Sequence, residues 1–294
     1  MYSNQVMKAV IPAAGWGTRF LPATKAQPKE MLPLIDKPAI QYIVEEAKDS
    51  GIHSIMIVTG KNKKSIEDHF DRSVELESML RDRKKVSMLD LVEEVGNLME
   101  VHYIRQKEQL GLGHAVYCAH NFIHDEPFAV LLPDDIILGE SPCIGQMIEA
   151  YRQTGTVIVA VMEVPNAETR RYGIVEPAED PDQPVFRVKS LVEKPDPDRA
   201  PSNLAVIGRY ILTPDILPIL AIQSPGAGGE IQLTDALNTL AGQGRVHAFR
   251  FSGTRYDIGE KFGFLQATIE IALARPDLGD SVSRYLMQRF SMGA

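Results

Sequence analysis

Short apolar runs alternate with segments of helical periodicity through the first half of the chain. Apolar residues recur at the spacing of one helix face from Ala39 to Ser50, and Gly51 then suits the end of a helix. The alternation of strand and helix predicts an α/β, Rossmann-like fold with a mostly parallel central sheet flanked by helices. The apolar runs predict buried strands at Val6–Ile11, His53–Thr59, Val101–Arg105, Phe128–Pro133 and Val157–Val164.

The pattern changes in two places. The segment from Ser65 to Gly96 is charged and helical in pattern, so we interpret it as a helical insertion, a solvated hairpin rather than a catalytic part. Beyond Thr169, strands separated by Pro- and Asp-rich turns replace the earlier alternation. Further strands are predicted at Tyr172–Glu176, Val185–Val192, Leu204–Leu212 and His247–Phe251, and helices at Thr213–Ile222, Gln232–Ala241, Lys261–Ala274 and Gly279–Met292.

We interpret the whole chain, 1–294, as a single domain. Its first half, about 1–165, would bind a nucleotide and contain the insertion at about 65–96; its second half, about 166–294, would bind a sugar. A length of 294 residues allows one large domain or two small ones. The last amphipathic segment suits either an oligomer contact or a cap on the sheet.

Composition and charge exclude several classes of protein. The net charge of −8 argues against a nucleic-acid-binding surface, which needs clustered basic residues. No apolar run approaches the ~20 residues of a membrane span, and the N-terminus lacks a signal-peptide pattern. Cys118 and Cys143 have no paired spacing and fit a reducing compartment. We therefore expect a cytoplasmic protein without membrane or nucleic-acid partners.

The stretch from Ala13 to Pro33 holds the most specific chemistry. Its two glycines, Gly15 and Gly17, allow the backbone to turn sharply and approach a ligand closely. Arg19 offers a planar fork for phosphate oxygens, and Lys29 adds a compact positive charge. A nucleoside triphosphate needs this combination. A dinucleotide turn would need a third glycine where Phe20 stands, and the residues of a Walker loop are absent. A purely structural turn is the remaining alternative.

The same stretch resembles the signature of sugar-nucleotide pyrophosphorylases, the nucleotidyltransferases that join a nucleoside triphosphate to a sugar 1-phosphate. Trp16 between the glycines and the run Pro28–Pro33 are similar to the bacterial UTP–glucose-1-phosphate uridylyltransferases. The resemblance covers nearly the whole chain. It continues, in the right order, at Gln106–Ala115, Leu131–Asp135, Tyr172–Glu176, Leu191–Pro195, Gly228–Asp235 and Arg255–Gly259.

The resemblance implies a reaction in which UTP and glucose 1-phosphate give UDP-glucose and pyrophosphate. An oxygen of the sugar phosphate attacks the α-phosphorus in line, and because this nucleophile is already an anion, no general base is needed. Catalysis then consists of positioning and charge neutralisation. By resemblance, Arg19 and Lys29 hold the triphosphate and the leaving pyrophosphate. The other nucleotide-binding residues implied are Ala13, Ala14, Gly15, Gly17, Thr18, Glu30, Gln106 and Gly111.

The run Leu131–Asp135 ends a buried strand with two acids. Carboxylates at a strand end suit Mg²⁺, which prefers one or two carboxylates with phosphate oxygens. A helix cap or turn is the commoner role of such a pair, but the resemblance aligns Asp134 with a metal-binding aspartate and leaves Asp135 to the turn or to a supporting role. Asp257 matches the second metal-facing acid. We therefore expect Mg²⁺ as cofactor, held by Asp134 and Asp257.

Two further motifs concern the base and the sugar. Gln106 can both donate and accept, so it can pair with a pyrimidine edge, and Gly111 permits close approach of the ring, although it also suits a helix start. By resemblance, Glu193 accepts from glucose hydroxyls and Lys194 binds the sugar phosphate. Taken alone, these two residues would be interpreted as a solvated ion pair. The backbone of Gly173 and Val206 is expected to line the sugar.

Several alternatives remain open from the sequence. A thymidylyltransferase shares the fold and the metal; such enzymes typically have an arginine where Gly228 stands, which weakly favours the uridylyl branch. A catalytically silent sugar-nucleotide-binding regulator and a nicotinamide-dependent dehydrogenase are less favoured. A zinc site from His114, His120 and His124 lacks cysteine partners. The resemblance also implies a homo-oligomer, a dimer or tetramer.

Overall fold

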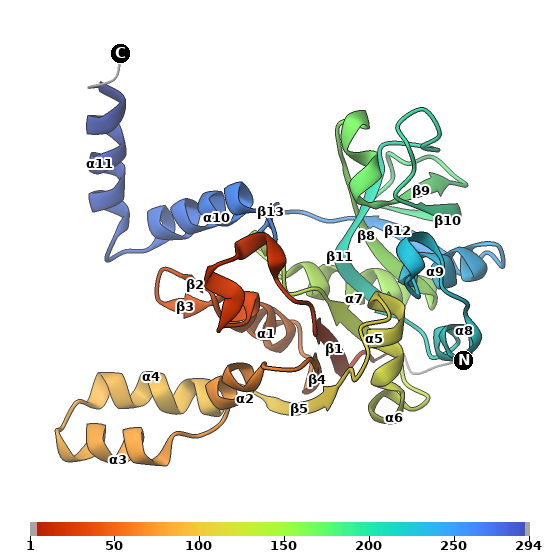
Figure 1. Cartoon of the computed structure of the whole chain (residues 1–294). Coiled ribbons are helices and arrows are strands. Elements are labelled where there is room, and N and C mark those ends of the chain that lie inside the picture. Colours follow the sequence, from red (N-terminus) through yellow and green to blue (C-terminus); the bar gives the residue numbers. More distant parts are fainter. Residues whose placement is uncertain (1–4, 292–294) are drawn as a thin grey trace.

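The computed structural model describes residues 5–291 and is built on a nine-stranded sheet (Figure 1). Strands β10 and β11 run antiparallel to the others, so the sheet is mostly parallel in strand direction, as the sequence predicts. Its order is β5 (Glu100–Arg105), β4 (Ser54–Thr59), β1 (Lys8–Ala13), β6 (Phe128–Leu131), β11 (Leu204–Leu212), β8 (Val157–Glu163), β12 (Val246–Arg250), β10 (Val185–Glu193) and β9 (Gly173–Pro177).

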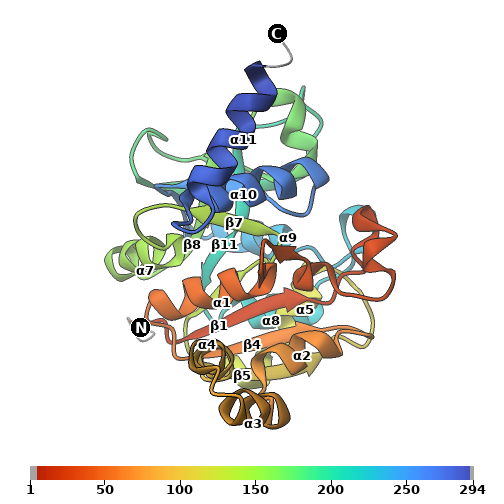
Figure 2. The same cartoon turned by 90° about the vertical axis from the view of Figure 1, so that its left-hand side faces the viewer.

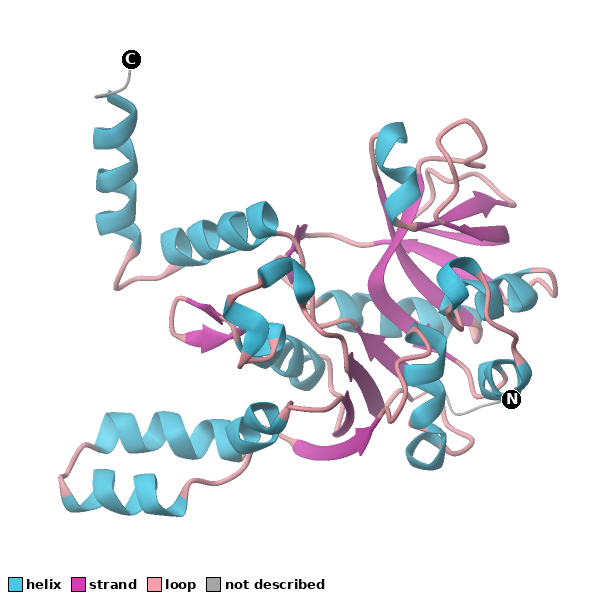
Figure 3. Cartoon of the chain, in the orientation of Figure 1, coloured by secondary structure: helices cyan, strands magenta, loops and turns pink. Residues whose placement is uncertain are grey.

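Helices cover both faces of the sheet (Figure 3). Successive residues of one strand point to opposite faces, so Ile11 joins one core and Val10 the other. Because both faces are buried at the centre of the sheet, strands such as β4 and β6 are continuous apolar runs, whereas β10 alternates buried with more exposed residues. One core contains α1 (Ala39–Asp49) and α7 (Cys143–Thr154); the other contains α5 (Leu112–Cys118), α6 (His120–Ile123), α8 (Ile216–Ile222) and α9 (Leu233–Ala241).

Two helical arms extend from this body (Figures 1 and 2). The first consists of α2 (Lys64–Phe70), α3 (Val74–Asp82) and α4 (Val86–Gly96), so the predicted insertion is helical as expected. The second consists of α10 (Lys261–Ala274) and α11 (Gly279–Ser291). The predicted end of this last helix, Met292, lies outside the described residues. Among residues 5–291, no helix combines the length and apolar character needed to cross a bilayer.

Several short elements lie outside the predicted pattern. Strand β7 (Asp135–Leu138) pairs antiparallel with β13 (Thr254–Asp257), and β2 (Pro33–Leu34) pairs with β3 (Lys37–Pro38). The β7–β13 pair fixes the residues around Asp134 and Asp257 against each other. Single 3₁₀ turns are found at η1 (Thr18–Phe20), η2 (Ala23–Lys25), η3 (Lys29–Met31), η4 (Asn166–Arg171) and η5 (Ala227–Gly229).

Candidate active site

The segments that follow β1, β5 and β6 meet at the carboxyl end of the parallel strands, the edge at which α/β sheets bind ligands. They line a cavity of about 550 Å³. A second cavity of about 470 Å³ adjoins it, and Arg19, Asp134 and Glu230 line both. The predicted nucleotide-binding residues that line the first cavity are Ala14, Gly15, Gly17, Thr18, Arg19, Lys29, Glu30, Gln106 and Gly111. Ala13 is fully buried at the end of β1 and does not line it.

The loop after β1 depends on Gly17. This residue has a φ of 66°, in the left-handed region that favours glycine. A Cβ at this position would lie 3.1 Å from the Lys29 Cβ, so a larger residue would press on the lysine. The Thr24 hydroxyl donates to the Gly17 carbonyl at 2.7 Å and closes the loop. The glycine therefore lets the loop fold back over Lys29.

Lys29 and Asp134 form an ion pair where the two cavities meet. Lys29 Nζ lies 2.8 Å from Asp134 Oδ2, and the two side chains are 21% and 32% exposed. Burial by itself would favour the neutral form of each group, but their mutual attraction outweighs it. The pKa of Asp134 lies below its ordinary value and that of Lys29 above it. Both groups are charged at neutral pH.

Asp257 lies beside Asp134. Strand β13 places it opposite Asp135, and the Ile258 N–H donates to the Asp134 carbonyl at 2.8 Å. A Cβ at Gly259 would lie 3.1 Å from Asp257 Oδ1 and 3.2 Å from Asp134 Oδ2, so the missing side chain lets one oxygen of each carboxylate approach the same residue. Two neighbouring carboxylates suit Mg²⁺, which takes its remaining ligands from water and phosphate.

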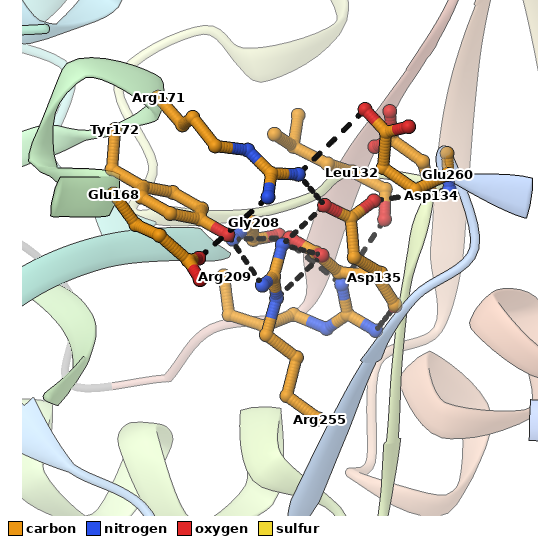
Figure 4. Close-up of polar contacts among 12 residues, drawn as sticks. Leu132, Asp134, Asp135, Glu168, Arg171, Tyr172, Gly208, Arg209, Arg255 and Glu260 are labelled. Carbon is orange, nitrogen blue, oxygen red and sulfur yellow. Dashed lines mark hydrogen bonds and ion pairs between the residues drawn. The ribbon is translucent and has the colours of Figure 1, made fainter. Parts of the chain in front are cut away.

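Guanidinium groups lie near these acids, and Figure 4 shows Arg171 reaching toward Glu260. Arg171 Nη2 lies 3.1 Å from Asp257 Oδ2 and 3.6 Å from Glu260 Oε1. Arg19 Nη1 lies 3.2 Å from the same Glu260 oxygen, and its side chain is 64% exposed. The carboxylates therefore hold guanidinium groups at the rim of both cavities, where phosphates could take over these contacts.

Arg209 anchors the turn that contains Asp134. This fully buried guanidinium donates to the carbonyls of Leu132 and Asp135 at 3.1 and 2.8 Å, on either side of Asp134. Glu46 of α1 neutralises it through contacts of 2.6 to 3.1 Å. A buried charge is tolerated only when paired and hydrogen-bonded in this way. We conclude that the ion pair fixes the turn.

Asp135 has a supporting place rather than a catalytic one. Its Oδ2 accepts from the Gly208 N–H at 2.8 Å, and its Oδ1 accepts from Arg255 Nε at 2.7 Å. Both carboxylate oxygens are thus committed to the protein. These are the contacts of a residue that supports the turn, whereas the binding of a ligand by Asp134 stays a prediction.

The second cavity contains the predicted sugar-binding set: Gly173, Glu193, Lys194 and Val206, together with Asp257. Glu193 ends β10 and accepts from the Thr234 hydroxyl at 2.5 Å. Lys194 Nζ lies 3.1 Å from Glu193 Oε1, and its side chain is 49% exposed. Lys194 has a φ of 49°, an uncommon conformation for a residue with a side chain. This bend at the strand end places Glu193 and Lys194 together in the cavity lining.

Comparison with known proteins shows the family to which this chain belongs. Residues 8–273 match the family model described as nucleotidyl transferase. The chain belongs to this family. The UTP–glucose-1-phosphate uridylyltransferase of Bacillus subtilis (strain 168) is 55% identical over 283 residues, 96% of this chain and 97% of that protein. The family resemblance and the nucleotidyltransferase fold predicted from the sequence are therefore confirmed.

Solved structures agree. A UTP-bound UGPase from Acinetobacter baumannii has a TM-score of 0.87 at 41% identity, covering 96% of this chain and 99% of that one. A UDP-glucose pyrophosphorylase complexed with UDP-glucose has a TM-score of 0.82 at 44% identity, covering 92% of this chain and 100% of that one. The uridylyl branch of the nucleotidyl transferase family is thus favoured over the thymidylyl alternative.

Sequence reasoning missed several residues of this nucleotidyl transferase site. Arg171, Tyr172 and Arg255 line the second cavity, and Gln109 lines the first, where its amide donates to the Ala14 carbonyl at 2.6 Å. Arg255 and Tyr172 lie in sequence motifs that match the family, so both could have been considered as site residues. No motif near Arg171 in the sequence marks it as a site residue, because its hydrogen-bond partner Asp257 lies 86 residues further along the chain.

Two of the three histidines considered as a zinc set, His114 and His120, have side-chain contacts with other residues. His120 stacks on Tyr117 with ring centroids 4.9 Å apart, and His114 contacts Gln106. Among residues 5–291, no three His, Cys, Asp or Glu side chains are grouped so that they could hold a metal ion. The carboxylates Asp134 and Asp257 are the metal-binding candidates that we retain.

Proposed function

We propose that this nucleotidyltransferase transfers the uridylyl group of UTP to glucose 1-phosphate, giving UDP-glucose and pyrophosphate. One observation carries the proposal: two adjoining cavities share a junction at which Lys29, Asp134, Asp257 and Arg171 bring cations and carboxylates together. Two anionic substrates that react through their phosphates need such a junction. The names of the relatives support the choice of substrates.

We assign each residue a role according to the cavity that it lines. Arg19 and Lys29 bind the triphosphate from the first cavity and hold the pyrophosphate as it leaves. Lys194 binds the sugar phosphate in the second cavity, and Glu193 accepts hydrogen bonds from glucose hydroxyls. The nucleophile is an anionic phosphate oxygen, so the protein must align it with the α-phosphorus and reduce repulsion rather than remove a proton.

We propose Asp134 and Asp257 as ligands of Mg²⁺. The approach of one oxygen from each carboxylate to Gly259 supports this assignment. When bound, the ion would screen the repulsion between the reacting phosphates and stabilise charge on the α-phosphate. The chain itself contributes the placement of these acids, through the β7–β13 pair and the Arg209 anchor.

The proposal is tested by pyrophosphate release from purified protein with Mg²⁺. UTP, dTTP, ATP, CTP and GTP are crossed with the 1-phosphates of glucose, galactose and mannose. We expect the highest kcat/KM for UTP with glucose 1-phosphate. A preference for dTTP would move the enzyme to the thymidylyl branch, and binding of nucleotide sugars without any release would identify a regulator instead.

Replacing Lys194 by Ala should mainly impair the use of glucose 1-phosphate. A lysine–phosphate contact is a charge-assisted hydrogen bond, so we expect KM for the sugar phosphate to rise about ten- to hundredfold. KM for UTP should change little, because Lys194 lines only the second cavity. Lys189→Ala is the matched control, since Lys189 lies on β10, the strand that leads to Lys194, but pairs with Glu176 and lines neither cavity. Unchanged kinetics for the sugar phosphate would remove Lys194 from the site.

We also propose a homo-oligomer, a dimer or tetramer, formed through α10 and α11. This arm exposes large apolar side chains, with Phe262 70% and Phe290 76% exposed, which monomers rarely leave to water. Light scattering should show a dimer or tetramer, and Phe290→Glu should lower its mass. Ile222→Glu is the control, because Ile222 lies on a different helix, α8, and is 86% exposed. A wild-type monomer at working concentration would contradict the proposal.

We propose that the chain works as one domain in the cytoplasm. The sheet continues from the nucleotide half, about 1–165, into the sugar half, about 166–294, and Glu230 and Gly259 of the second half line the first cavity. Neither half then has a complete site alone. Cys118 and Cys143 are both free thiols, which fits a reducing compartment.

A further inference from the structure

The side chain of Gln106 is held on two sides. Gln106 follows β5, is 6% exposed and lines the first cavity; its backbone N–H donates to the Thr59 carbonyl at 2.8 Å. Its Nε2 lies 3.1 Å from the Gly111 carbonyl oxygen and 3.0 Å from His114 Nδ1. The side chain that could recognise the base is therefore already fixed in the protein without a bound nucleotide.

The Gly111 carbonyl determines the orientation of this amide. A carbonyl oxygen only accepts, so the Gln106 nitrogen must face it; the reversed amide would set two acceptors against each other. The carbonyl itself is held in place, because the Ala115 N–H donates to it at 3.1 Å. Gly111 has a φ of 106°, and a Cβ there would lie 2.9 Å from the Ile231 carbonyl oxygen, so only glycine fits this position. The neighbouring Gly113 N–H donates to that same Ile231 oxygen at 2.8 Å.

The tautomer of His114 follows from this orientation. Since Gln106 Nε2 carries only hydrogens, His114 Nδ1 must accept one of them, and the imidazole hydrogen must be on Nε2. That nitrogen lies 3.9 Å from Cys118 Sγ, a weak acceptor. Both hydrogens of the Gln106 amide are then bound by the protein, one by Gly111 and one by His114. Only Oε1 is left for a ligand.

We propose that His114 is a positioning residue that, together with the Gly111 carbonyl, holds the Gln106 amide in one orientation and so sets base specificity. This inference rests on the proposed function and deepens it. With Oε1 as its only free atom, Gln106 accepts from the N3–H of uracil. Cytosine has a lone pair at N3, which would face the lone pairs of Oε1, so the site rejects CTP. Thymine has the same N3–H as uracil, so this device does not separate UTP from dTTP.

The test compares substitutions that differ in one acceptor. In His114→Leu a methyl group takes the place of Nδ1, and in His114→Asn the Oδ1 atom takes that place and can still accept from Gln106. His114→Ala is a second deletion, chosen because Ala suits the helix α5. For each variant, kcat/KM is measured with UTP, CTP and dTTP at saturating glucose 1-phosphate, and calorimetry measures binding of UMP and CMP.

We expect the Leu and Ala variants to lower the UTP-to-CTP ratio of kcat/KM about tenfold, the effect of one lost hydrogen bond that fixes a buried amide. The UTP-to-dTTP ratio should stay at the wild-type value, and the Asn variant should keep both ratios. An unchanged UTP-to-CTP ratio in Leu and Ala, or an equal loss with all three nucleotides, would overturn the inference. Failure of the proposed function shows separately, as wild-type protein that does not turn over UTP.

Discussion

Replacing Asp134 by Asn is expected to reduce metal-dependent turnover by on the order of 10²-fold or more. The amide has nearly the shape of the carboxylate but no charge, so it can neither hold Mg²⁺ strongly nor balance Lys29, 2.8 Å away. The Mg²⁺ concentration that gives half the maximal rate should rise at the same time. Initial rates of pyrophosphate release over a series of Mg²⁺ concentrations measure both effects.

Two controls separate a metal ligand from a structural residue. Asp90→Asn makes the same chemical change on an exposed face of α4, far from both cavities, and should leave the rate unaltered. Binding of Mn²⁺, followed by electron paramagnetic resonance, reports the metal without turnover and should weaken only in Asp134→Asn. Near-normal activity of that variant with Mg²⁺ would remove Asp134 from the metal site.

Much of the fold follows from local pattern. Strands β1, β4 and β6 are buried on both faces, as their continuous apolar runs predict; Val10 and Ile11 of β1 enter two different cores. Helix α10 begins and ends at the predicted residues, Lys261 and Ala274. Elements of this kind form wherever a periodic apolar face meets a packed layer, so their positions can be predicted without knowing the partner strand or helix.

The strands β7 and β13 could not be predicted in this way. Each is only four residues long, and they pair with each other across more than a hundred residues of sequence. No local propensity encodes such a pairing, which depends on where the rest of the sheet places the two segments. It is nevertheless this pair that sets Asp257 beside Asp134.

In the candidate site, too, some features could be predicted from local sequence pattern and others could not. That the loop after β1, Gln106 and Asp134 converge could be predicted, because all three follow strands expected to be parallel. Which atoms contact one another in the site could not be predicted from the sequence. Lys29 reaches Asp134 across 105 positions, and Arg171 reaches Asp257 across 86. Such contacts depend on side-chain directions that only the assembled fold determines.

Replacing Lys29 by Met should lower kcat by on the order of 10²- to 10³-fold. The lysine is charged, since its pKa is raised. Its side chain is only partly exposed and ends at the junction of the two cavities. There it can stabilise the charge that accumulates on the leaving pyrophosphate. Methionine keeps the length of the stem but removes that charge. Steady-state rates in the forward direction measure the loss.

The reverse reaction identifies which charge Lys29 stabilises. A clamp on the pyrophosphate predicts that Lys29→Met raises KM for pyrophosphate at least tenfold while the Kd of UDP-glucose, which lacks the leaving group, changes little. General damage to the loop would weaken both ligands together. Lys48→Met, on an exposed part of α1, controls for the loss of a surface charge. Equal losses in pyrophosphate and UDP-glucose binding would overturn the assignment of Lys29 to the leaving group.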